Sequence, residues 1–181
     1  MYEMELKVRV DHATVRSRLE SIGATRLGAV EQADTYYDAP HRSFAETDEA
    51  LRIRRESDDT AERSTTKITY KGALVDAESK TREERETSVE DGDAMDAILD
   101  ALGFSPAATV AKRRERYRLD EFTITLDDVD GLGQFLEIET GTDASGLDDA
   151  RDRAVDLLES LDLDPDAQLR TSYLSMLLEQ Q

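Results

Sequence analysis

Two glutamates close to the N-terminus are the first residues whose type and spacing indicate chemistry. Glu3 and Glu5 belong to a stretch that alternates charged odd positions with mostly apolar even positions from residue 2 to residue 10. An alternation of period two is typical of a β-strand with one charged and one apolar face. On such a strand the two carboxylates leave the same face roughly 7 Å apart and repel by about 2 kcal/mol at an effective dielectric constant near 20. If this face lines a closed space, a cation must lie there, and carboxylate oxygens suit Mg²⁺, Mn²⁺ or Ca²⁺.

The same alternation of charge recurs in later segments, and together these segments supply both signs. The charged positions that follow Lys7 and Arg9 are Arg52, Arg54, Lys67, Lys71, Arg82, Glu84, Glu86, Lys112, Arg114, Asp127, Glu137 and Glu139. These faces hold about as many basic as acidic residues, although the whole chain has 42 acidic and 23 basic residues. Basic residues are therefore concentrated on the strand faces.

Opposed acidic and basic faces indicate one type of ligand, a polyphosphate that carries a divalent metal. Arginine and lysine neutralise phosphate oxygens, and arginine can do so with two parallel hydrogen bonds. Carboxylates hold the metal, which bridges to the phosphates. Carboxylates alone would indicate a metal site, and basic residues alone an anion site. Together they favour metal-assisted phosphoryl or nucleotidyl transfer, in which catalysis depends on positioning and charge stabilisation.

Hydrophobic periodicity divides the chain into short strands and amphipathic helices. We predict strands over residues 2–10, 32–38, 50–55, 66–72, 81–89, 109–119, 122–128 and 134–140, with 24–30 as a connector or short strand. We predict helices over residues 11–22, 93–102, 144–161 and 171–178. The segments 39–48, 56–64 and 73–80 are predicted loops, and 104–107 a predicted turn. Because most strands follow one another through short loops, the sheet should be antiparallel.

The predicted fold is mainly β (α+β): an eight-stranded antiparallel sheet closed into a tunnel or barrel, with a charged lumen and flanking helices. This arrangement places the charged faces inside and covers the apolar outer faces with helices. The inverse arrangement, with an apolar barrel core and charges in water, is the usual expectation from composition. The balance of signs favours the tunnel, because solvated faces of this chain should be as acidic as the rest of it.

Composition limits the class of protein. A chain of 181 residues is long enough for one domain with a full core, and we predict a single domain over residues 1–181. The net charge of −19 argues against nucleic acid or an anionic membrane as the general partner. Only five of the 23 basic residues are lysines, and this acidic, lysine-poor pattern resembles the proteins of salt-accumulating halophiles.

Features that the sequence lacks exclude further chemistries. It contains no cysteine, so disulfides, thiolate catalysis and cysteine-ligated zinc are impossible. No apolar run approaches the length of about 18 residues that a membrane-spanning helix needs, and no signal peptide is recognisable. We therefore predict a cytoplasmic protein without a membrane partner.

The ordered series of motifs resembles the CYTH superfamily, the triphosphate tunnel metalloenzymes. Glu3-x-Glu5-x-Lys7 is similar to the N-terminal signature of that family. Matching motifs follow in the same order as in the family over nearly the whole chain. They are Gln32-x-Asp34-x-Tyr36-Tyr37, Leu51-Arg52-Ile53-Arg54, Tyr70-Lys71-Gly72, Arg82-x-Glu84-x-Glu86, Val110-x-Lys112-x-Arg114, the segment from Leu126 to Glu139, and Thr171-Ser172-Tyr173. The glycine turn at Gly131 and Gly133, the terminal Ser-Tyr pair and the short length look most like class IV adenylyl cyclases and their archaeal relatives.

The resemblance implies a role for each charged lumen residue. The metal ligands would be Glu3, Glu5, Glu137 and Glu139, with Asp127 near the metal and Glu84 or Glu86 in support. The triphosphate would be bound by Arg52, Arg54, Lys67, Lys71, Arg82, Lys112 and Arg114. Lys7 would act at the reacting end, and Lys7, Lys112 and Arg114 form the predicted catalytic set. The implied cofactor is Mg²⁺ or Mn²⁺.

The reaction that the resemblance implies first is that of a class IV adenylyl cyclase, which converts ATP to cyclic AMP and pyrophosphate. The enzymatic alternative is a triphosphatase that acts on inorganic triphosphate, thiamine triphosphate or a nucleoside triphosphate. The non-enzymatic alternative is a module that binds a polyphosphate without turnover. Dimers are common among relatives, so a homodimer is a further expectation.

The remaining charged and aromatic residues are assigned structural positions. Salt bridges at the surface or rim are expected for Arg55, Arg113 and Arg116, and surface positions for His12 and His41. Core packing or hydrogen bonding is expected for Tyr36 and Tyr37, and packing of the last helix against the barrel for Ser172 and Tyr173.

Overall fold

The strands of the computed structural model close into an antiparallel barrel. The structure describes residues 2–59 and 63–181. Around the barrel the strands follow the order β1-β5-β4-β3-β2-β6-β7-β8. Their bounds are β1 (Tyr2–Arg9), β2 (Thr25–Asp38), β3 (Ala50–Asp58), β4 (Ser64–Leu74), β5 (Lys80–Val89), β6 (Ser105–Leu119), β7 (Phe122–Val129) and β8 (Gly133–Thr142). The predicted mainly β fold, an eight-stranded closed tunnel with flanking helices, is confirmed for the described residues.

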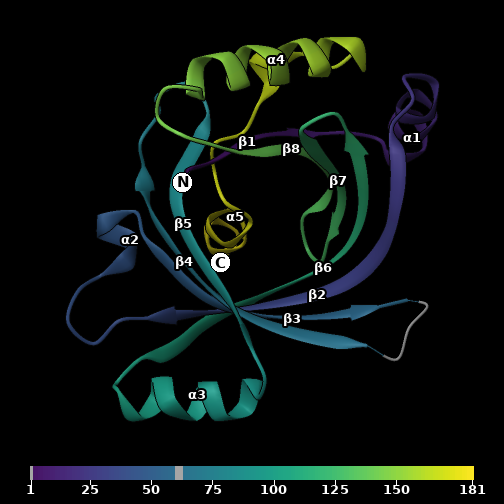
Figure 1. The fold of residues 1–181 in the computed structure, drawn as a ribbon. Coiled ribbons are helices and arrows are strands. Elements are labelled where there is room, and N and C mark those ends of the chain that lie inside the picture. The colour runs from purple at the N-terminus through teal and green to yellow at the C-terminus, as the bar shows by residue number, and fades with distance from the viewer. Residues whose placement is uncertain (1, 60–62) are drawn as a thin grey trace.

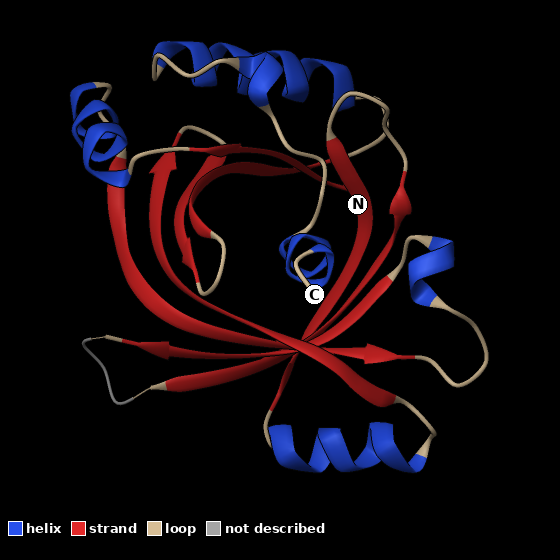
Figure 2. Ribbon diagram, turned by 180° about the vertical axis from the view of Figure 1, so that it is seen from behind, coloured by secondary structure: helices blue, strands red, loops and turns tan. Residues whose placement is uncertain are grey.

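Helices cover the outside of the barrel, and one helix lies within it. They are α1 (His12–Ser21), α2 (Phe44–Thr47), α3 (Gly92–Ala101), α4 (Leu147–Ser160) and α5 (Tyr173–Glu179), with a short 3-10 helix at Pro165–Ala167. Figures 1 and 2 show α1, α3 and α4 outside the strands and α5 inside the ring that the strands form. No helix in the described part of the chain is long and apolar enough to cross a membrane.

Strand β2 is longer than the sequence predicted. The segment 24–30 is not a connector, because β2 pairs with β6 from Thr25 onwards. A bulge between Arg26 and Gly28 interrupts the pairing, and Gly28 has a φ of 135°, in the region that glycine tolerates best. The bulge is the irregularity that made this segment look like a break in the strand.

Strand β6 also begins earlier than predicted. The proposed turn at 104–107 gives way to strand from Ser105, because β6 continues to pair with the end of β2. A second bulge, between Tyr36 and Tyr37, lies opposite Pro106, which has no backbone N–H to donate. The predicted loop at 39–48 contains the short helix α2, whose N-terminus is capped by Ser43.

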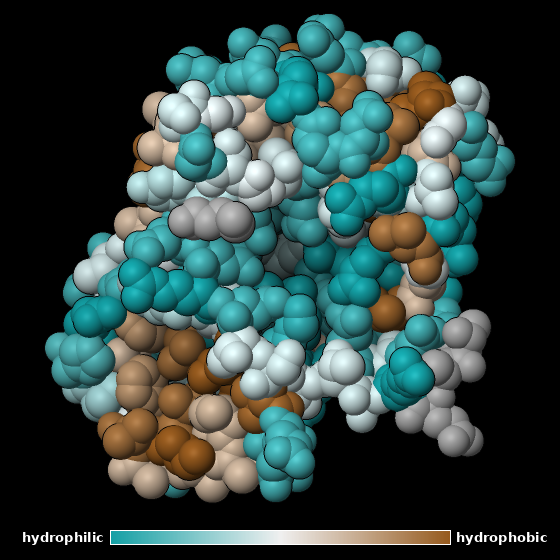
Figure 3. Space-filling view, viewed as in Figure 1, coloured by the Kyte–Doolittle hydropathy of each residue, from teal (hydrophilic) through white to brown (hydrophobic). Residues whose placement is uncertain are grey.

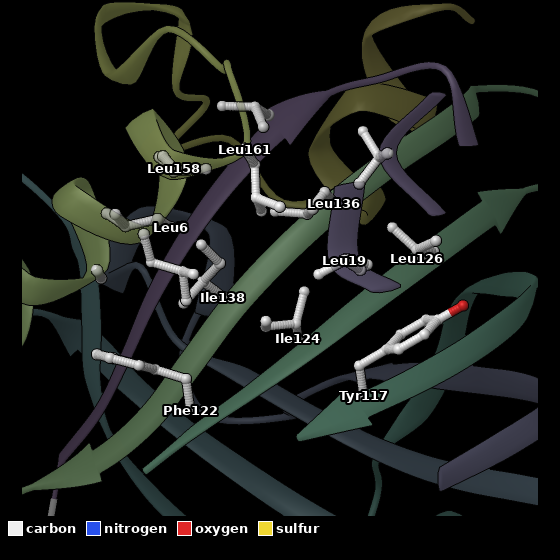
Figure 4. Packing of buried hydrophobic residues seen from close by; sticks show 14 of the residues in the cluster. Leu6, Leu19, Tyr117, Phe122, Ile124, Leu126, Leu136, Ile138, Leu158 and Leu161 are labelled. Atoms are coloured by element: carbon white, nitrogen blue, oxygen red, sulfur yellow. The ribbon is translucent and has the colours of Figure 1, made fainter. Parts of the chain in front are cut away.

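The apolar positions of the strands form a layer between the barrel and its covering helices. Met4, Leu6 and Val8 of β1 are at most 2% exposed, and they share one cluster with residues of α1 and α4. Figure 4 shows Leu6 and Ile138 next to Leu158 of α4. Burying each such side chain contributes about 1.5–3 kcal/mol. A shift of one residue would turn the charged face into this layer, so the layer fixes which side chains point into the lumen.

His12 is buried at the start of α1, and the prediction that it lies at the surface is wrong. Its Nε2 atom lies 3.0 Å from the backbone oxygen of Phe135 on β8. The helix begins here because the Asp11 carboxylate accepts a hydrogen bond from the N–H of Thr14 at 3.0 Å. This start lies against β8, a contact between segments far apart in the sequence. His41 is exposed, as predicted.

Candidate metal and triphosphate site

A cavity of about 590 Å³ inside the barrel collects the charged faces of the strands. The predicted site residues that line it are Glu3, Glu5, Lys7, Arg52, Arg54, Lys67, Lys71, Arg82, Glu84, Glu86, Lys112, Arg114, Glu137 and Glu139. Asp127 does not line it, although Arg114 and Tyr173, whose side chains bind Asp127, do. In Figure 3 a hollow bordered by hydrophilic residues opens near the middle of the molecule. The tunnel therefore has the charged lumen that the strand pattern predicted.

Carboxylates from β1 and β8 meet at one place on the cavity wall. Oxygen atoms of Glu3, Glu5 and Glu139 all lie within 4.8 Å of one another. The register brings them together, since Glu5 is directly opposite Glu139 across β1 and β8. Ligands at 2.0–2.1 Å from Mg²⁺ lie up to about 4.2 Å apart. A small side-chain movement would fit these three hard oxygen donors to Mg²⁺ or Mn²⁺.

The cluster concentrates negative charge in a buried place. Burial, and after it the charge of Glu3, raises the pKa of Glu139 to about 7. Burial opposes the ionisation of Glu3 as well, but Lys71, a hydrogen bond with Glu84 and the charge of Arg52 together outweigh burial and lower the pKa of Glu3 to about 2. A divalent cation among these oxygens would favour the ionised form of Glu139, so the electrostatics suit a cation here.

Two predicted metal ligands contact basic residues and lie apart from this cluster. Arg114 donates from Nη2 to Glu137 at 2.6 Å, and from Nε and Nη2 to the two oxygens of Asp127, also at 2.6 Å. Burial is the largest influence and opposes ionisation of both carboxyls, but Arg114 and the nearby lysines together outweigh it and lower the pKa of each. Asp127 is fully buried on the inner face of β7, directly opposite Arg114 of β6, and holds Arg114 in place, whereas Glu137 reaches the cavity.

Two arginines of β3 line the wall opposite β8, since β3 and β8 are four strands apart around the ring. Arg54 donates from Nε and Nη2 to the two oxygens of Asp34, each at 2.6 Å, and Arg52 donates to Asp34 from Nη1 at 3.4 Å. The Nε of Arg52 is buried and has no hydrogen-bond partner among the described residues. A buried donor without an acceptor is costly. A phosphate oxygen in the cavity would supply that acceptor.

Two further predicted triphosphate ligands lie towards the edges of the cavity. Lys67 has a side chain that is 45% exposed, and its Nζ lies 2.6 Å from Glu86. Arg82 donates to the backbone oxygen of Gly72 at 2.7 Å and to the Asp48 carboxylate at 2.9 Å. Both residues line the cavity while already bound to protein groups, so they are less available to a ligand than Arg52.

The three arginines that were expected to form salt bridges at the surface or rim do form salt bridges. The three pairs are Arg55 with Asp96 at 2.5 Å, Arg113 with Asp59 at 2.5 Å, and Arg116 with Glu56 at 2.7 Å. Of these, the pair of Arg116 and Glu56 lines the cavity, and the other two lie outside it.

Lys80 is a lumen residue that the sequence analysis placed in a loop. It begins β5 directly opposite Glu5 of β1, and its Nζ lies 3.0 Å from Glu5 Oε1. Lys71 makes a similar contact with Glu3 at 2.9 Å, and it also reaches Glu84 at 2.8 Å. With Lys80 included, all five lysines of the chain line the cavity. The scarcity of lysine elsewhere was the signal that could have identified it, because lysine is ordinarily a surface residue.

The C-terminal helix brings an aromatic ring to two of the predicted catalytic residues. The ring centroid of Tyr173 lies 4.0 Å from Nζ of Lys7 and 4.9 Å from Nζ of Lys112. Its hydroxyl donates to Asp127 at 2.9 Å. Burial, and after it the charge of Arg114, lowers the pKa of Lys112 to about 7. Tyr173 does pack α5 against the barrel, as predicted, but its contacts with both lysines were not foreseen.

Comparison with a known sequence and a known structure shows close similarity over the whole chain. A Methanocaldococcus jannaschii protein named putative adenylate cyclase MJ0240 is 37% identical over 178 residues, which cover 97% of this chain and 98% of that protein. The structure of PH1819 from Pyrococcus horikoshii OT3 has a TM-score of 0.91 and 36% identity, and the match covers 99% of each chain.

A more distant structure shares the fold, and a separate comparison with a model of a protein family identifies the family. HpAC1 from Hippeastrum matches with a TM-score of 0.67 and 16% identity over 99% of this chain and 96% of that one. The model of the CYTH domain matches residues 1–173. Members of this family are metal-dependent enzymes that act on triphosphate or nucleotide substrates. With its eight-stranded tunnel and this match over nearly its full length, the chain belongs to the CYTH domain family.

Proposed function

We propose that this chain is a metal-dependent enzyme that converts ATP to cyclic AMP and pyrophosphate, as class IV adenylyl cyclases do. The observation that carries the proposal is the pair of opposed walls in one closed cavity. Glu3, Glu5 and Glu139 form the acidic wall, and Arg52 and Arg54 form the basic one. A triphosphate with a divalent cation complements both walls. The similarity to the M. jannaschii protein, which is named as a cyclase, supports this choice.

The residues on the two walls would divide the work of binding. Glu3, Glu5 and Glu139 would hold Mg²⁺ or Mn²⁺, and Glu137 lines the same cavity, bound to Arg114. When bound, such a metal neutralises phosphate oxygens and favours the ionised form of a nucleophile. Arg52 would bind the phosphates through donors that Asp34 leaves free, and its position is fixed before the substrate enters.

Bond making at the α-phosphorus would take place near Lys7, Lys112 and Arg114. The ribose 3′-oxygen forms a bond to the α-phosphorus while the bond to the pyrophosphate oxygen breaks. The 3′-hydroxyl loses its proton, and negative charge develops on the departing pyrophosphate. Lys7 and Arg114 would stabilise that charge. The lowered pKa of Lys112, about 7, suits it to accept the proton near neutral pH.

A triphosphatase is the second candidate, and one comparison favours it. A dominant triphosphatase activity is stated for HpAC1, which shares this fold and is itself named an adenylyl cyclase. The same walls would bind the phosphate chain in both reactions. With water as the nucleophile at the terminal phosphorus, the product would be orthophosphate from inorganic triphosphate, thiamine triphosphate or a nucleoside triphosphate. A module that binds polyphosphate without turnover is the third candidate.

Product analysis separates the three candidates. The protein is incubated with Mg²⁺ or Mn²⁺ and either ATP or inorganic triphosphate, at high salt because of its acidic composition. Cyclic AMP with pyrophosphate is the expected result and identifies a cyclase. Release of orthophosphate identifies a hydrolase instead. Heat of binding without any product identifies a binding module, and the absence of both binding and turnover contradicts the proposal.

A further inference from the structure

Two of the three clustered carboxylates already bind a lysine. Nζ of Lys71 lies 2.9 Å from Glu3, and Nζ of Lys80 lies 3.0 Å from Glu5. Both lysine side chains are largely enclosed, at 17% and 11% exposed. The pair of Lys80 and Glu5 is built into the sheet, because the two residues are directly opposite across β1 and β5. Each ammonium therefore lies where it competes with a metal for a carboxylate.

We propose that Lys80, together with Lys71, exchanges partners when the two ligands bind, leaving the carboxylates to the metal and turning to the triphosphate. The proposal rests on the function proposed above and adds a role for Lys80. A metal about 2.1 Å from the Glu5 oxygen would be no more than about 5 Å from an ammonium bound to that same oxygen. Two cations at this distance in a buried site repel strongly. The lysine must therefore move or the metal must bind weakly.

The exchange couples the two ligands. Without a triphosphate, a divalent cation has to displace the Lys80 ammonium, which then has no ion-pair partner among the described residues, and to separate Lys71 from Glu3. With a triphosphate present, the displaced ammonium groups gain phosphate oxygens, which lysine binds well. Metal and triphosphate should each raise the affinity for the other, and by linkage they do so by the same factor.

Lys80 is the better residue for testing this than Lys71. Lys71 also lies 2.8 Å from Glu84, so it keeps a carboxylate partner when Glu3 is taken. Lys80 has Glu5 as its one ion-pair partner in the described part of the chain. Lys67 provides a matched control, because it is another cavity lysine in an ion pair, at 2.6 Å from Glu86, outside the clustered carboxylates.

The test measures Mn²⁺ binding, by calorimetry and electron paramagnetic resonance, for the wild type and the variants K80M, K80Q, K80R and K67M. Each titration is made with Mn²⁺ alone and again with a bis(methylene) triphosphonate, whose bridging carbons prevent cleavage. We expect K80M and K80Q to bind Mn²⁺ alone on the order of tenfold more tightly than the wild type. We expect K80R and K67M to bind Mn²⁺ as the wild type does, and the triphosphonate to enhance binding less in K80M.

The sign of the change distinguishes competition from a structural role. If Lys80 only positioned Glu5, replacing it would weaken Mn²⁺ binding. The proposal is therefore overturned if K80M and K80Q are folded, as judged by circular dichroism, and bind Mn²⁺ no more tightly than the wild type. K80Q keeps a hydrogen-bond donor for Glu5 and carries the test if K80M does not fold. If K80M binds Mn²⁺ more tightly but the triphosphonate enhances its Mn²⁺ binding as much as in the wild type, Lys80 does not turn to the triphosphate and the proposed exchange of partners is overturned. Failure of the proposed metal and triphosphate site is different, because then even the wild type binds neither Mn²⁺ nor the triphosphonate, and the choice between cyclase and hydrolase is decided by product analysis.

Discussion

The two faces of the barrel sheet are built from the same strands but contain opposite kinds of residues. On β1, Leu6 points into the apolar layer under α4, and Lys7 points into the cavity. Both are equally enclosed, at 1% exposed. Packing alone stabilises the outer face, which needs no ligand. Buried charges stabilise a fold little or not at all, even when paired. The comparison indicates that the outer face maintains the barrel and the inner face exists for what it binds.

The largest expected effect comes from removing charge on the inner face. The double change Glu5→Gln with Glu137→Gln should reduce metal-dependent turnover on the order of 10³-fold, about 4 kcal/mol in the barrier. Mn²⁺ binding should weaken in parallel. Steady-state rates and Mn²⁺ titration check both points. Survival of metal-dependent turnover or binding in this variant would show that the site is wrongly assigned.

A change on the outer face should have the opposite signature. Ile138→Ala removes a fully buried side chain of β8, between the site residues Glu137 and Glu139. It should lower the free energy of unfolding by about 2–5 kcal/mol and leave turnover per folded molecule nearly unchanged. Denaturant unfolding measures the loss. Ile98→Ala on α3, where the side chain is 51% exposed, is the control and should change stability by less than about 0.5 kcal/mol. Loss of turnover in Ile138→Ala without loss of stability would contradict the division between the faces.

The pH dependence of metal binding sharpens the description of the inner face. Because the pKa of Glu139 is raised from 4.5 to about 7, the folded protein holds this proton more tightly than the unfolded chain does. Its ionisation lowers the free energy of unfolding as pH rises from 4.5 to about 7, and protons compete with metal below about 7. Mn²⁺ affinity should therefore rise about fivefold from pH 6 to pH 7 and about twofold more above pH 7 before it levels off. Calorimetry in two buffers of different ionisation enthalpy would detect the released proton, and an affinity independent of pH would refute the assignment.

Tyr173 should give the smallest of these effects, because it contacts Lys7, Lys112 and Asp127 without carrying a charge itself. Tyr173→Phe removes the hydroxyl that donates to Asp127 and keeps the ring beside Lys7 and Lys112. We expect a loss of about 1 kcal/mol in stability and a turnover change of only a few-fold. Tyr173→Leu removes the ring as well and should shift the acidic limb of the pH–rate profile, because Lys112 accepts a proton only in its neutral form and loses a neighbour. Identical pH profiles for the two variants would argue against an influence of the ring on Lys112.

Much of the barrel and its lumen could be predicted, because alternation along a strand is a local property of the sequence. The charged positions of β1, β3 and β8 were assigned to the lumen from their spacing, and all but the exposed Arg9 among those assigned line the cavity. Errors arose where local patterns are ambiguous. The bulge at Gly28 resembled a break in β2, and Lys80 resembled part of a loop because it stands at the first position of its strand.

The sequence by itself determined the two faces of each strand and the gathering of all five lysines within segments of mixed charge. Only the tertiary structure decided which charges meet. Closure of the barrel places Glu5 between Lys80 on β5 and Glu139 on β8, residues that are far from it in the sequence. It also places Asp127 where it accepts hydrogen bonds from Arg114, and the ring of Tyr173 beside Lys7. The physical reason is that period and composition are local, whereas register between strands follows from how the whole sheet packs and closes.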